Sequence, residues 1–233
     1  MPCLGIAPFA WLCAIVSSGP VPPAPEPARA RMVEEQIAAR GVKDPAVLAA
    51  MREVPRHLFV RPADLARAYD DHPLSIGHGQ TISQPYIVAL MTELARPRPG
   101  HVALEVGTGS GYQAAVLSRI VGRVYTIELL ETLATTARRR LADLGYDNVT
   151  VRAGDGYNGW PEAAPFDIIL VTASAPDIPP PLVQQLKAGG RMIIPVGATG
   201  DTQELRVVEK KADGSLEIRT VIPVRFVPLL RQP

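Results

Sequence analysis

An apolar run that ends in closely spaced glycines carries the clearest chemical signal in this chain. Residues 102–106 are apolar except for Glu105, and the segment that follows is Gly107-Thr108-Gly109-Ser110-Gly111. The pattern predicts a buried strand that turns tightly into a helix. The glycines, which lack Cβ atoms, leave room for a ligand, and the unpaired N–H groups at the start of the helix can bind it. Tyr112 stands where a dinucleotide fingerprint requires its third glycine, so a smaller nucleoside ligand is expected.

Two more acidic residues follow later strand-like runs. Glu128 comes directly after the run 123–127, about 20 positions beyond Gly107, where doubly wound folds place a carboxylate that accepts both hydrogen bonds of a ribose diol. Asp155 follows the run 149–152 in the segment Gly154-Asp155-Gly156-Tyr157. It is expected to accept a hydrogen bond from an adenine amino group, although Asp beside Gly also makes a common turn.

A polar segment precedes the glycines. Residues 71–85 show no hydrophobic period and are rich in glycine, hydroxyl and amide groups, which predicts a long loop. Loops of this length in compact domains are usually binding loops or lids. A helix is expected from Tyr86 to Leu94. Ser83 is expected to contribute to a binding site. It could also be the N-cap of this helix, since Pro85 stands at an early helical position, and the two roles are compatible.

Apolar runs alternate with helical patterns through the second half of the chain. Strands are expected at residues 102–106, 123–127, 149–152, 166–172 and 191–196, and helices at 114–121, 133–144 and 181–186, the last one stopped by Gly189-Gly190. This alternation predicts an α/β fold with a doubly wound, mostly parallel sheet and a ligand crevice at the carboxyl ends of the strands. A hairpin over 204–210 and 216–221 predicts an antiparallel C-terminal edge, and residues 225–229 are expected to add a further strand.

The N-terminal part predicts a helical cap. Helices are expected at 32–40 and 45–51, with Asp44 as the N-cap of the second. A chain of 233 residues with 47% hydrophobic residues can bury one substantial core. We therefore expect one domain over 31–233, with the cap and a substrate loop in 31–100 and the ligand-binding core and C-terminal strands in 101–233.

Residues 1–30 resemble a signal-like leader followed by a linker. The apolar stretch from Leu4 to Val16 is shorter than the ~20 residues of a membrane span, so no stable span is expected. No Lys or Arg precedes it, so it is either an export signal or, if translation starts at Met32, upstream sequence. The prolines between Gly19 and Ala30 predict an extended linker, with folded sequence starting near Arg31.

The composition disfavours several classes of function. The formal net charge of +1 argues against nucleic acid as a partner, and Arg138-Arg139-Arg140 is expected on a solvated helix face. Both cysteines, Cys3 and Cys13, lie in the leader, so the folded part has neither a disulfide nor a cysteine nucleophile. The histidines are scattered and show no metal-ligand spacing, so no metal site is expected.

Residues 32–229 resemble the protein-L-isoaspartate O-methyltransferases, Rossmann-like class I enzymes that depend on S-adenosylmethionine. The segments that carry the resemblance are 76–86, 104–113, 154–156, 166–176 and 225–229. The first and the last are specific to the family, and the glycine segment has the E-x-G-x-G-x-G form that class I methyltransferases share. Ala103 and Ala173-Ser174-Ala175 depart only mildly from the family pattern.

The resemblance implies methyl transfer from S-adenosylmethionine to the free α-carboxylate of L-isoaspartyl residues in damaged proteins and peptides. It implies Ser83 as the catalytic residue, with substrate contacts from Thr81, Ile82, Val227 and Pro228. The cofactor-binding residues that it implies are Gln80, Thr81, Ile82, Ser83, Glu105, Gly107, Thr108, Gly109, Ser110, Glu128, Leu129, Asp155 and Gly156. A carboxylate with a pKa near ~4 is ionised at neutral pH, so Ser83 is expected to orient it without a general base.

The resemblance further implies a cytoplasmic monomer, with a periplasmic or secreted protein as the alternative if the leader is an export signal. Three other functions fit less well. A methyltransferase for nucleic acid or small molecules is expected to carry a cysteine nucleophile or a D/N-P-P-Y/F motif, where this chain has Thr172-Ala173-Ser174-Ala175. A serine hydrolase needs Ser83 in a G-x-S-x-G turn, which it lacks. A binding module without activity is expected to have lost the segment around Ser83, which is intact.

Overall fold

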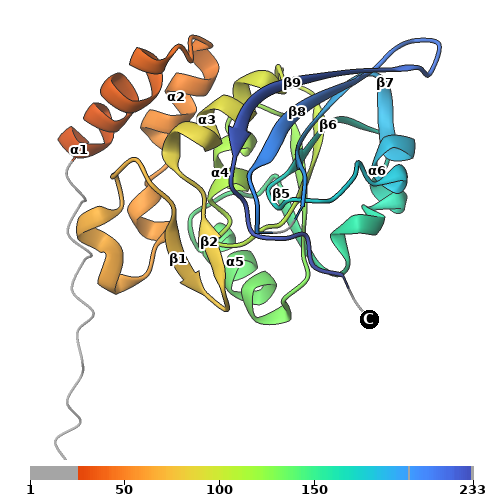
Figure 1. The fold of residues 1–233 in the computed structure, drawn as a ribbon. Helices are drawn as coiled ribbons and strands as arrows, with labels where there is room; N and C mark the ends of the chain where they lie inside the picture. Colours follow the sequence, from red (N-terminus) through yellow and green to blue (C-terminus); the bar gives the residue numbers. More distant parts are fainter. Residues whose placement is uncertain (1–25, 199, 232–233) are drawn as a thin grey trace, which may run out of the picture.

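A seven-stranded sheet forms the centre of the computed structural model, which describes residues 26–198 and 200–231. The strand order is β5-β4-β3-β6-β7-β8-β9 (Figure 1). The strands from β5 to β7 in this order run parallel, whereas β8 and β9 continue the sheet in antiparallel pairing. The predicted mostly parallel α/β sheet with an antiparallel C-terminal edge is confirmed.

The parallel strands bring the predicted site residues to one edge of the sheet. They are β3 (Val102–Val106), β4 (Arg123–Glu128), β5 (Val149–Ala153), β6 (Phe166–Val171) and β7 (Leu186–Val196). Val106 of β3 pairs with Ile127 of β4 and with Val171 of β6, so these three strands end level with one another. The residues at their carboxyl ends therefore lie close together; they include Gly107, Glu128 and Thr172.

Helices cover both faces of the sheet. Successive side chains of a strand point to opposite faces, so neighbouring residues of β3 pack against different helices. Ala103 packs in one cluster with residues of α3 (Pro85–Leu94) and α4 (Tyr112–Ser118). Its neighbour Leu104 packs in another cluster with α6 (Pro180–Gln185). Helix α5 (Glu131–Asp143) lies against β5 and buries the predicted stripe of Leu133, Ala137 and Leu141.

The N-terminal cap is helical, as predicted, but it begins earlier. It comprises α1 (Glu26–Arg31), a π-helical turn (Met32–Ile37), a 3-10 turn (Ala38–Arg40) and α2 (Pro45–Glu53). The Asp44 carboxylate accepts a hydrogen bond from the Ala46 N–H at 2.8 Å and caps α2. The extended linker predicted up to Ala30 is wrong at its end, because Pro27 lies in the first turn of α1, where no N–H group is needed.

The leader segment from Leu4 to Val16 lies outside the described residues. From Glu26 onward, none of the described helices combines the length and the apolar character that crossing a membrane requires.

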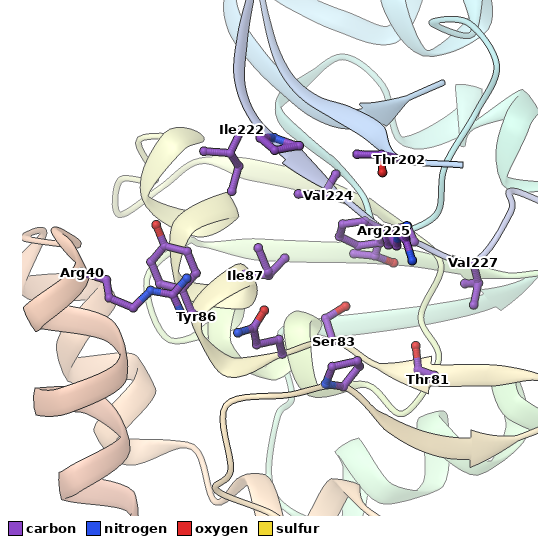
Figure 2. Close-up of a pocket in the computed structure, with 15 residues that line it drawn as sticks. Arg40, Thr81, Ser83, Tyr86, Ile87, Thr202, Ile222, Val224, Arg225 and Val227 are labelled. Atoms are coloured by element: carbon purple, nitrogen blue, oxygen red, sulfur yellow. The ribbon is translucent and has the colours of Figure 1, made fainter. Parts of the chain in front are cut away.

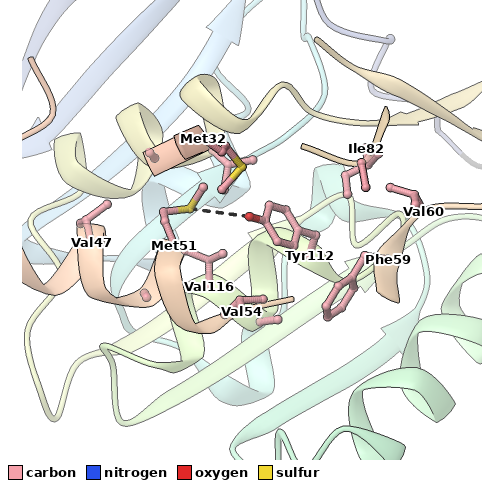
Figure 3. Close-up of a cluster of buried hydrophobic side chains, with 14 of the residues drawn as sticks. Met32, Val47, Met51, Val54, Phe59, Val60, Ile82, Tyr112 and Val116 are labelled. Carbon is pink, nitrogen blue, oxygen red and sulfur yellow. Dashed lines mark hydrogen bonds between the residues drawn. The ribbon is translucent and has the colours of Figure 1, made fainter. Parts of the chain in front are cut away.

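An apolar cluster fastens the cap to the sheet, and Tyr112 lies at its centre (Figure 3). The Tyr112 ring meets the Phe59 ring edge-on with centroids 5.5 Å apart, and its hydroxyl lies 3.9 Å from the Met51 sulfur. A glycine at position 112 would remove these contacts. The departure from a dinucleotide fingerprint therefore has a structural role, since it joins the start of α4 to the cap.

The predicted loop 71–85 contains a small hairpin instead of irregular chain. Its strands are β1 (Leu74–Gly77) and β2 (Gln80–Ile82), which pair antiparallel (Figure 1). His78 and Gly79 form the two-residue turn with φ angles of 54° and 71°. The prediction failed because such short strands of mixed polarity give no alternation signal.

Two expectations for the C-terminal half are wrong, although β8 (Gln203–Lys210) and β9 (Leu216–Val224) form the predicted hairpin. Residues 225–229 form no strand; they cross the strand ends, where the Ser174 N–H donates to Val227 O at 2.8 Å and the Leu229 N–H donates to Ser174 O at 2.7 Å. Gly189-Gly190 lies inside β7 and does not stop α6. A Cβ at Gly190 would lie 2.8 Å from Lys187 O, beside an irregular pairing with β6.

Candidate active site

The turn after β3 is shaped by a threonine at the end of β6. Gly107 has a φ of 98°, and a Cβ added there would lie 2.5 Å from Thr172 Oγ1. The Thr172 hydroxyl donates to Gly107 O at 2.7 Å and to Val106 O at 3.0 Å, so the two oxygens share its hydrogen. Both the backbone conformation and the space therefore require glycine at position 107. The glycine turn and the end of β6 form one unit.

Glu128 closes one side of the glycine turn. Its Oε2 accepts a hydrogen bond from the Gly109 N–H at 2.8 Å, and its Oε1 accepts one from the Leu130 N–H at 3.0 Å. Each carboxylate oxygen keeps further acceptor capacity, so Glu128 can still accept two hydrogen bonds from a ribose diol. It borders a cleft of about 60 Å³, here called the Glu128 cleft, whose lining includes Gln80, Thr81, Gly107, Gly109, Leu129, Gly156, Thr172, Val227 and Pro228.

Glu105 is fully buried beneath the turn. The Thr126 hydroxyl donates to its Oε2 at 2.5 Å, whereas its Oε1 has no hydrogen-bond partner among the described residues. Burial raises the pKa of Glu105 to about 8, and the hydrogen bond from Thr126 opposes this shift. Glu105 borders a cavity of about 30 Å³ together with Ile82, Ser83, Thr108 and Ser110. An unpartnered buried carboxyl oxygen beside a cavity favours a ligand that forms a hydrogen bond with it.

Ser83 also borders a larger cavity of about 660 Å³, here called the Ser83 cavity (Figure 2). Most of its walls are apolar, with Pro73, Ile87, Ile222, Pro223, Val224, Phe226 and Val227 among the lining residues. The Ser83 hydroxyl makes no hydrogen bond with any described residue. Helix α3 has Gln84 at its N-cap and no side-chain cap, so Ser83 does not take the capping role that the sequence allowed. Its hydroxyl is available to a ligand.

The residue after Ser83 is anchored to the N-terminal cap. The Gln84 side-chain amide donates to Asp71 O at 3.0 Å and to Asp71 Oδ2 at 2.8 Å. Arg40 donates to the same Oδ2 at 2.6 Å, and its guanidinium carbon lies 3.5 Å from the centre of the Tyr86 ring. Through Asp71, the cap holds the start of α3 and the serine that precedes it.

Thr81 and Thr172 border the Ser83 cavity, the Glu128 cleft and the small cavity at Glu105. The three spaces therefore meet at these two threonines, with Ser83 beside them. Thr172 is not among the residues predicted from the sequence, although its position at the end of a parallel strand is a signal that points to it. Arg40, Tyr86 and Arg225 also line the Ser83 cavity, and tertiary packing alone brings them there.

The predicted residues gather at this edge but differ in what they border. Val227 borders both the Ser83 cavity and the Glu128 cleft. Pro228 borders the Glu128 cleft but not the Ser83 cavity. Asp155 borders neither. It accepts a hydrogen bond from the Tyr157 N–H at 3.0 Å and lies 3.5 Å from Arg231 Nε. Its role toward adenine stays a prediction.

The basic run on α5 is only partly the solvated face that we predicted. Arg140 donates to Ser110 O at 2.8 Å and helps to hold the glycine segment. Arg138 donates to Val151 O at 3.2 Å. Within residues 26–198 and 200–231, no cluster of three His, Cys, Asp or Glu side chains is arranged to hold a metal ion.

The family model of protein-L-isoaspartate(D-aspartate) O-methyltransferase matches residues 28–232. The chain belongs to this family. A protein-L-isoaspartate O-methyltransferase 2 of Polaromonas sp. is 64% identical over 189 residues, which cover 81% of this chain and 90% of the relative. A protein-L-isoaspartate O-methyltransferase of Opitutus terrae is 59% identical over 205 residues, which cover 88% and 87% of the two chains.

Solved structures of this family share the fold. A protein-L-isoaspartate O-methyltransferase with 34% sequence identity matches with a TM-score of 0.79 over 86% of this chain, which spans 65% of that longer chain. A beta-aspartate methyltransferase of Plasmodium falciparum in complex with S-adenosyl-L-homocysteine matches at 27% identity with a TM-score of 0.74, over 88% of this chain and 99% of its own. The resemblance inferred from the sequence motifs is confirmed.

Proposed function

We propose that this protein transfers a methyl group from S-adenosylmethionine to the free α-carboxylate of L-isoaspartyl residues in damaged proteins and peptides. The observation that carries this proposal is the position of Ser83. Its hydroxyl has no partner among the described residues, and it borders both the Ser83 cavity and the small cavity at the glycine turn. A substrate carboxylate bound in the first space would therefore face a methyl donor bound in the second.

The residues at the glycine turn fit S-adenosylmethionine. Gly107 and Gly109 offer backbone without Cβ atoms, Glu128 keeps acceptor capacity for ribose hydroxyls, and Glu105 Oε1 can form a hydrogen bond with a polar group of the ligand. The Glu128 cleft, at about 60 Å³, is smaller than the ~300 Å³ of typical small-molecule sites. We therefore expect residues 227–230, which line one part of this cleft, to move outward when the cofactor enters.

The bound cofactor supplies an electrophilic methyl group on a sulfonium, whose carbon–sulfur electrons stay on sulfur as the new carbon–oxygen bond forms. The protein has little covalent chemistry to perform, because the acceptor is already ionised at neutral pH. Ser83 donates a hydrogen bond to one carboxylate oxygen and leaves the other free to attack. The apolar walls formed by Ile222, Val224 and Phe226 exclude water. They favour a reaction in which an anion and a cation become two neutral products.

The direct test compares two peptides of one sequence, the first with an internal L-isoaspartyl residue and the second with an ordinary α-linked aspartyl residue. Mass spectrometry after incubation with S-adenosylmethionine should detect a methyl ester on the first peptide alone, since only its linkage leaves an α-carboxylate free. Reactions without the cofactor are the control. Equal methylation of both peptides, or methylation of neither, would contradict the proposal.

We further propose that the protein acts as a monomer in the cytoplasm. A single chain already brings Ser83 and Glu128 to adjoining spaces that meet at Thr172, so one copy can hold both the acceptor and the cofactor. Light scattering after gel filtration measures the mass in solution. N-terminal sequencing of the native protein separates the two locations, because a start at Met32 supports the cytoplasm and a start near Gly19 supports export to the periplasm or the medium.

A further inference from the structure

The Ser83 cavity has an uneven charge lining. Two charged side chains border it, Arg40 and Arg225, and no Asp or Glu is among its described lining residues. The charge of Arg40 is neutralised, because Asp71 Oδ2 lies 2.6 Å from its Nη1. Arg40 is also held in place by its stacking on Tyr86. Arg40 therefore forms part of the cavity wall and offers little net charge to a ligand.

Arg225 differs from Arg40 because it has no partner within the described part of the chain. Its side chain is exposed, and it makes neither a salt bridge nor a hydrogen bond with a described residue. The backbone on either side is fixed: Val224 is buried, and the Phe226 N–H donates to Gln203 Oε1 at 2.9 Å. Figure 2 shows Arg225 above Ser83, well apart from Arg40 at the left of the view. A fixed backbone thus presents an uncompensated cation at the cavity.

We propose that Arg225 binds a second carboxylate of the substrate, carried by an Asp or Glu side chain beside the isoaspartyl residue. The enzyme would then prefer damage sites in acidic sequence contexts. This inference rests on the proposed function and adds a specificity-determining residue to it. Because Arg225 lies at the exposed side of a cavity that also holds Ser83, one extended peptide can meet both residues.

The acceptor carboxylate itself is a poor partner for Arg225. Its negative charge disappears when the methyl group is transferred, so a cation in contact with it would stabilise the reactants more than the transition state. The neutral hydroxyl of Ser83 avoids most of this penalty. A carboxylate on a neighbouring residue keeps its charge throughout, so its attraction to Arg225 strengthens binding without opposing the reaction.

The test uses isoaspartyl peptides with blocked termini that differ in a single residue, Glu, Gln or Lys, placed either before or after the isoaspartyl residue. For at least one position, kcat/KM for the Glu peptide should exceed that for the Gln peptide about five- to tenfold. The difference should lie mainly in KM, and it should shrink as salt is added. A Gln peptide with a free carboxyl terminus measures the other source of a second carboxylate. A preference for that peptide alone would overturn the side-chain assignment.

Variants connect the preference to Arg225. In Arg225→Gln the ratio between Glu and Gln peptides should fall to about one, and in Arg225→Glu the preference should shift to the Lys peptide. Arg219→Gln is the matched control, since Arg219 is an exposed residue of β9 outside the cavity lining, and it should keep the wild-type ratio. Thermal unfolding of each variant checks that it is folded.

Two results would overturn the inference while leaving the proposed function intact. One is equal kcat/KM of the wild type for the Glu and Gln peptides, with both methylated. The other is an unchanged Glu preference in Arg225→Gln. If the wild type methylated no isoaspartyl peptide at all, the proposed function would fail, and the role of Arg225 would fail with it.

Discussion

Replacing Gly107 with alanine tests how the glycine turn is built. The new Cβ would lie 2.5 Å from Thr172 Oγ1, and the residue would keep a φ of 98°, which L-residues rarely adopt. The backbone conformation costs about 1 to 3 kcal/mol and the overpacking a similar amount. We therefore expect Gly107→Ala to lower the free energy of unfolding by about 2 to 6 kcal/mol.

A second substitution separates these two costs. Thr172→Ala removes the hydroxyl that the new Cβ would meet, at the loss of its hydrogen bond to Gly107 O, which is worth about 1 kcal/mol. The double variant should therefore be about 1 to 3 kcal/mol more stable than the sum of the two single effects, because the overpacking is relieved and the backbone cost stays.

Urea unfolding followed by circular dichroism measures these differences. Gly145→Ala is the matched control, since Gly145 has a φ of 74° and its added Cβ would meet nothing within 4 Å, so it reports the backbone cost alone. Additive effects of Gly107→Ala and Thr172→Ala, or a Gly107→Ala variant as stable as Gly145→Ala, would refute the account of the turn.

Two further predictions concern the acids of the site. Glu128→Ala should weaken S-adenosylmethionine binding by about 1 to 3 kcal/mol, because charge-assisted hydrogen bonds are lost; unchanged affinity in calorimetry would remove Glu128 from the site. Burial raises the pKa of Glu105 from 4.5 to about 8, so the folded protein holds a proton that the unfolded chain releases. As the pH rises from 4.5 to about 8, the free energy of unfolding should therefore fall by up to about 1.4 kcal/mol per pH unit. Glu105→Gln should lack this slope in urea unfolding across that range.

The parts of the site that the sequence predicts are those fixed by burial along single strands. Runs such as 102–106 and 166–172 are nearly all apolar because both faces of a central parallel strand are covered. The residue that ends such a run must lie at the carboxyl edge of the sheet, which is why Glu128 and the glycine turn were predictable. That Glu128 and the glycine turn contact each other could be predicted from the order of the elements along the chain alone.

The remaining parts depend on which elements become neighbours. Thr172 reaches Gly107 only because β6 pairs with β3, and no local pattern specifies that pairing. Residues 225–229 look like a strand because Phe226, Val227 and Leu229 are apolar. These side chains are half-buried over the strand ends, while among the described residues their backbone bonds with Ser174 and with the Gln203 side chain and not with a neighbouring strand. Arg225 directly follows the end of β9, so its place at the Ser83 cavity depends on where β9 joins the sheet, beside β8.

The central claim is that Ser83 orients the acceptor carboxylate where the Ser83 cavity meets the glycine turn. The most direct measurement is the single-turnover rate of methyl transfer to an isoaspartyl peptide by Ser83→Ala, with Ser75→Ala, an exposed serine of β1, as the control. Losing one hydrogen bond to a charged group should cost about 1.5 to 3 kcal/mol, or about ten- to a hundredfold in rate, with a smaller change in cofactor affinity. A wild-type rate in Ser83→Ala, or an equal loss in Ser75→Ala, would contradict this account.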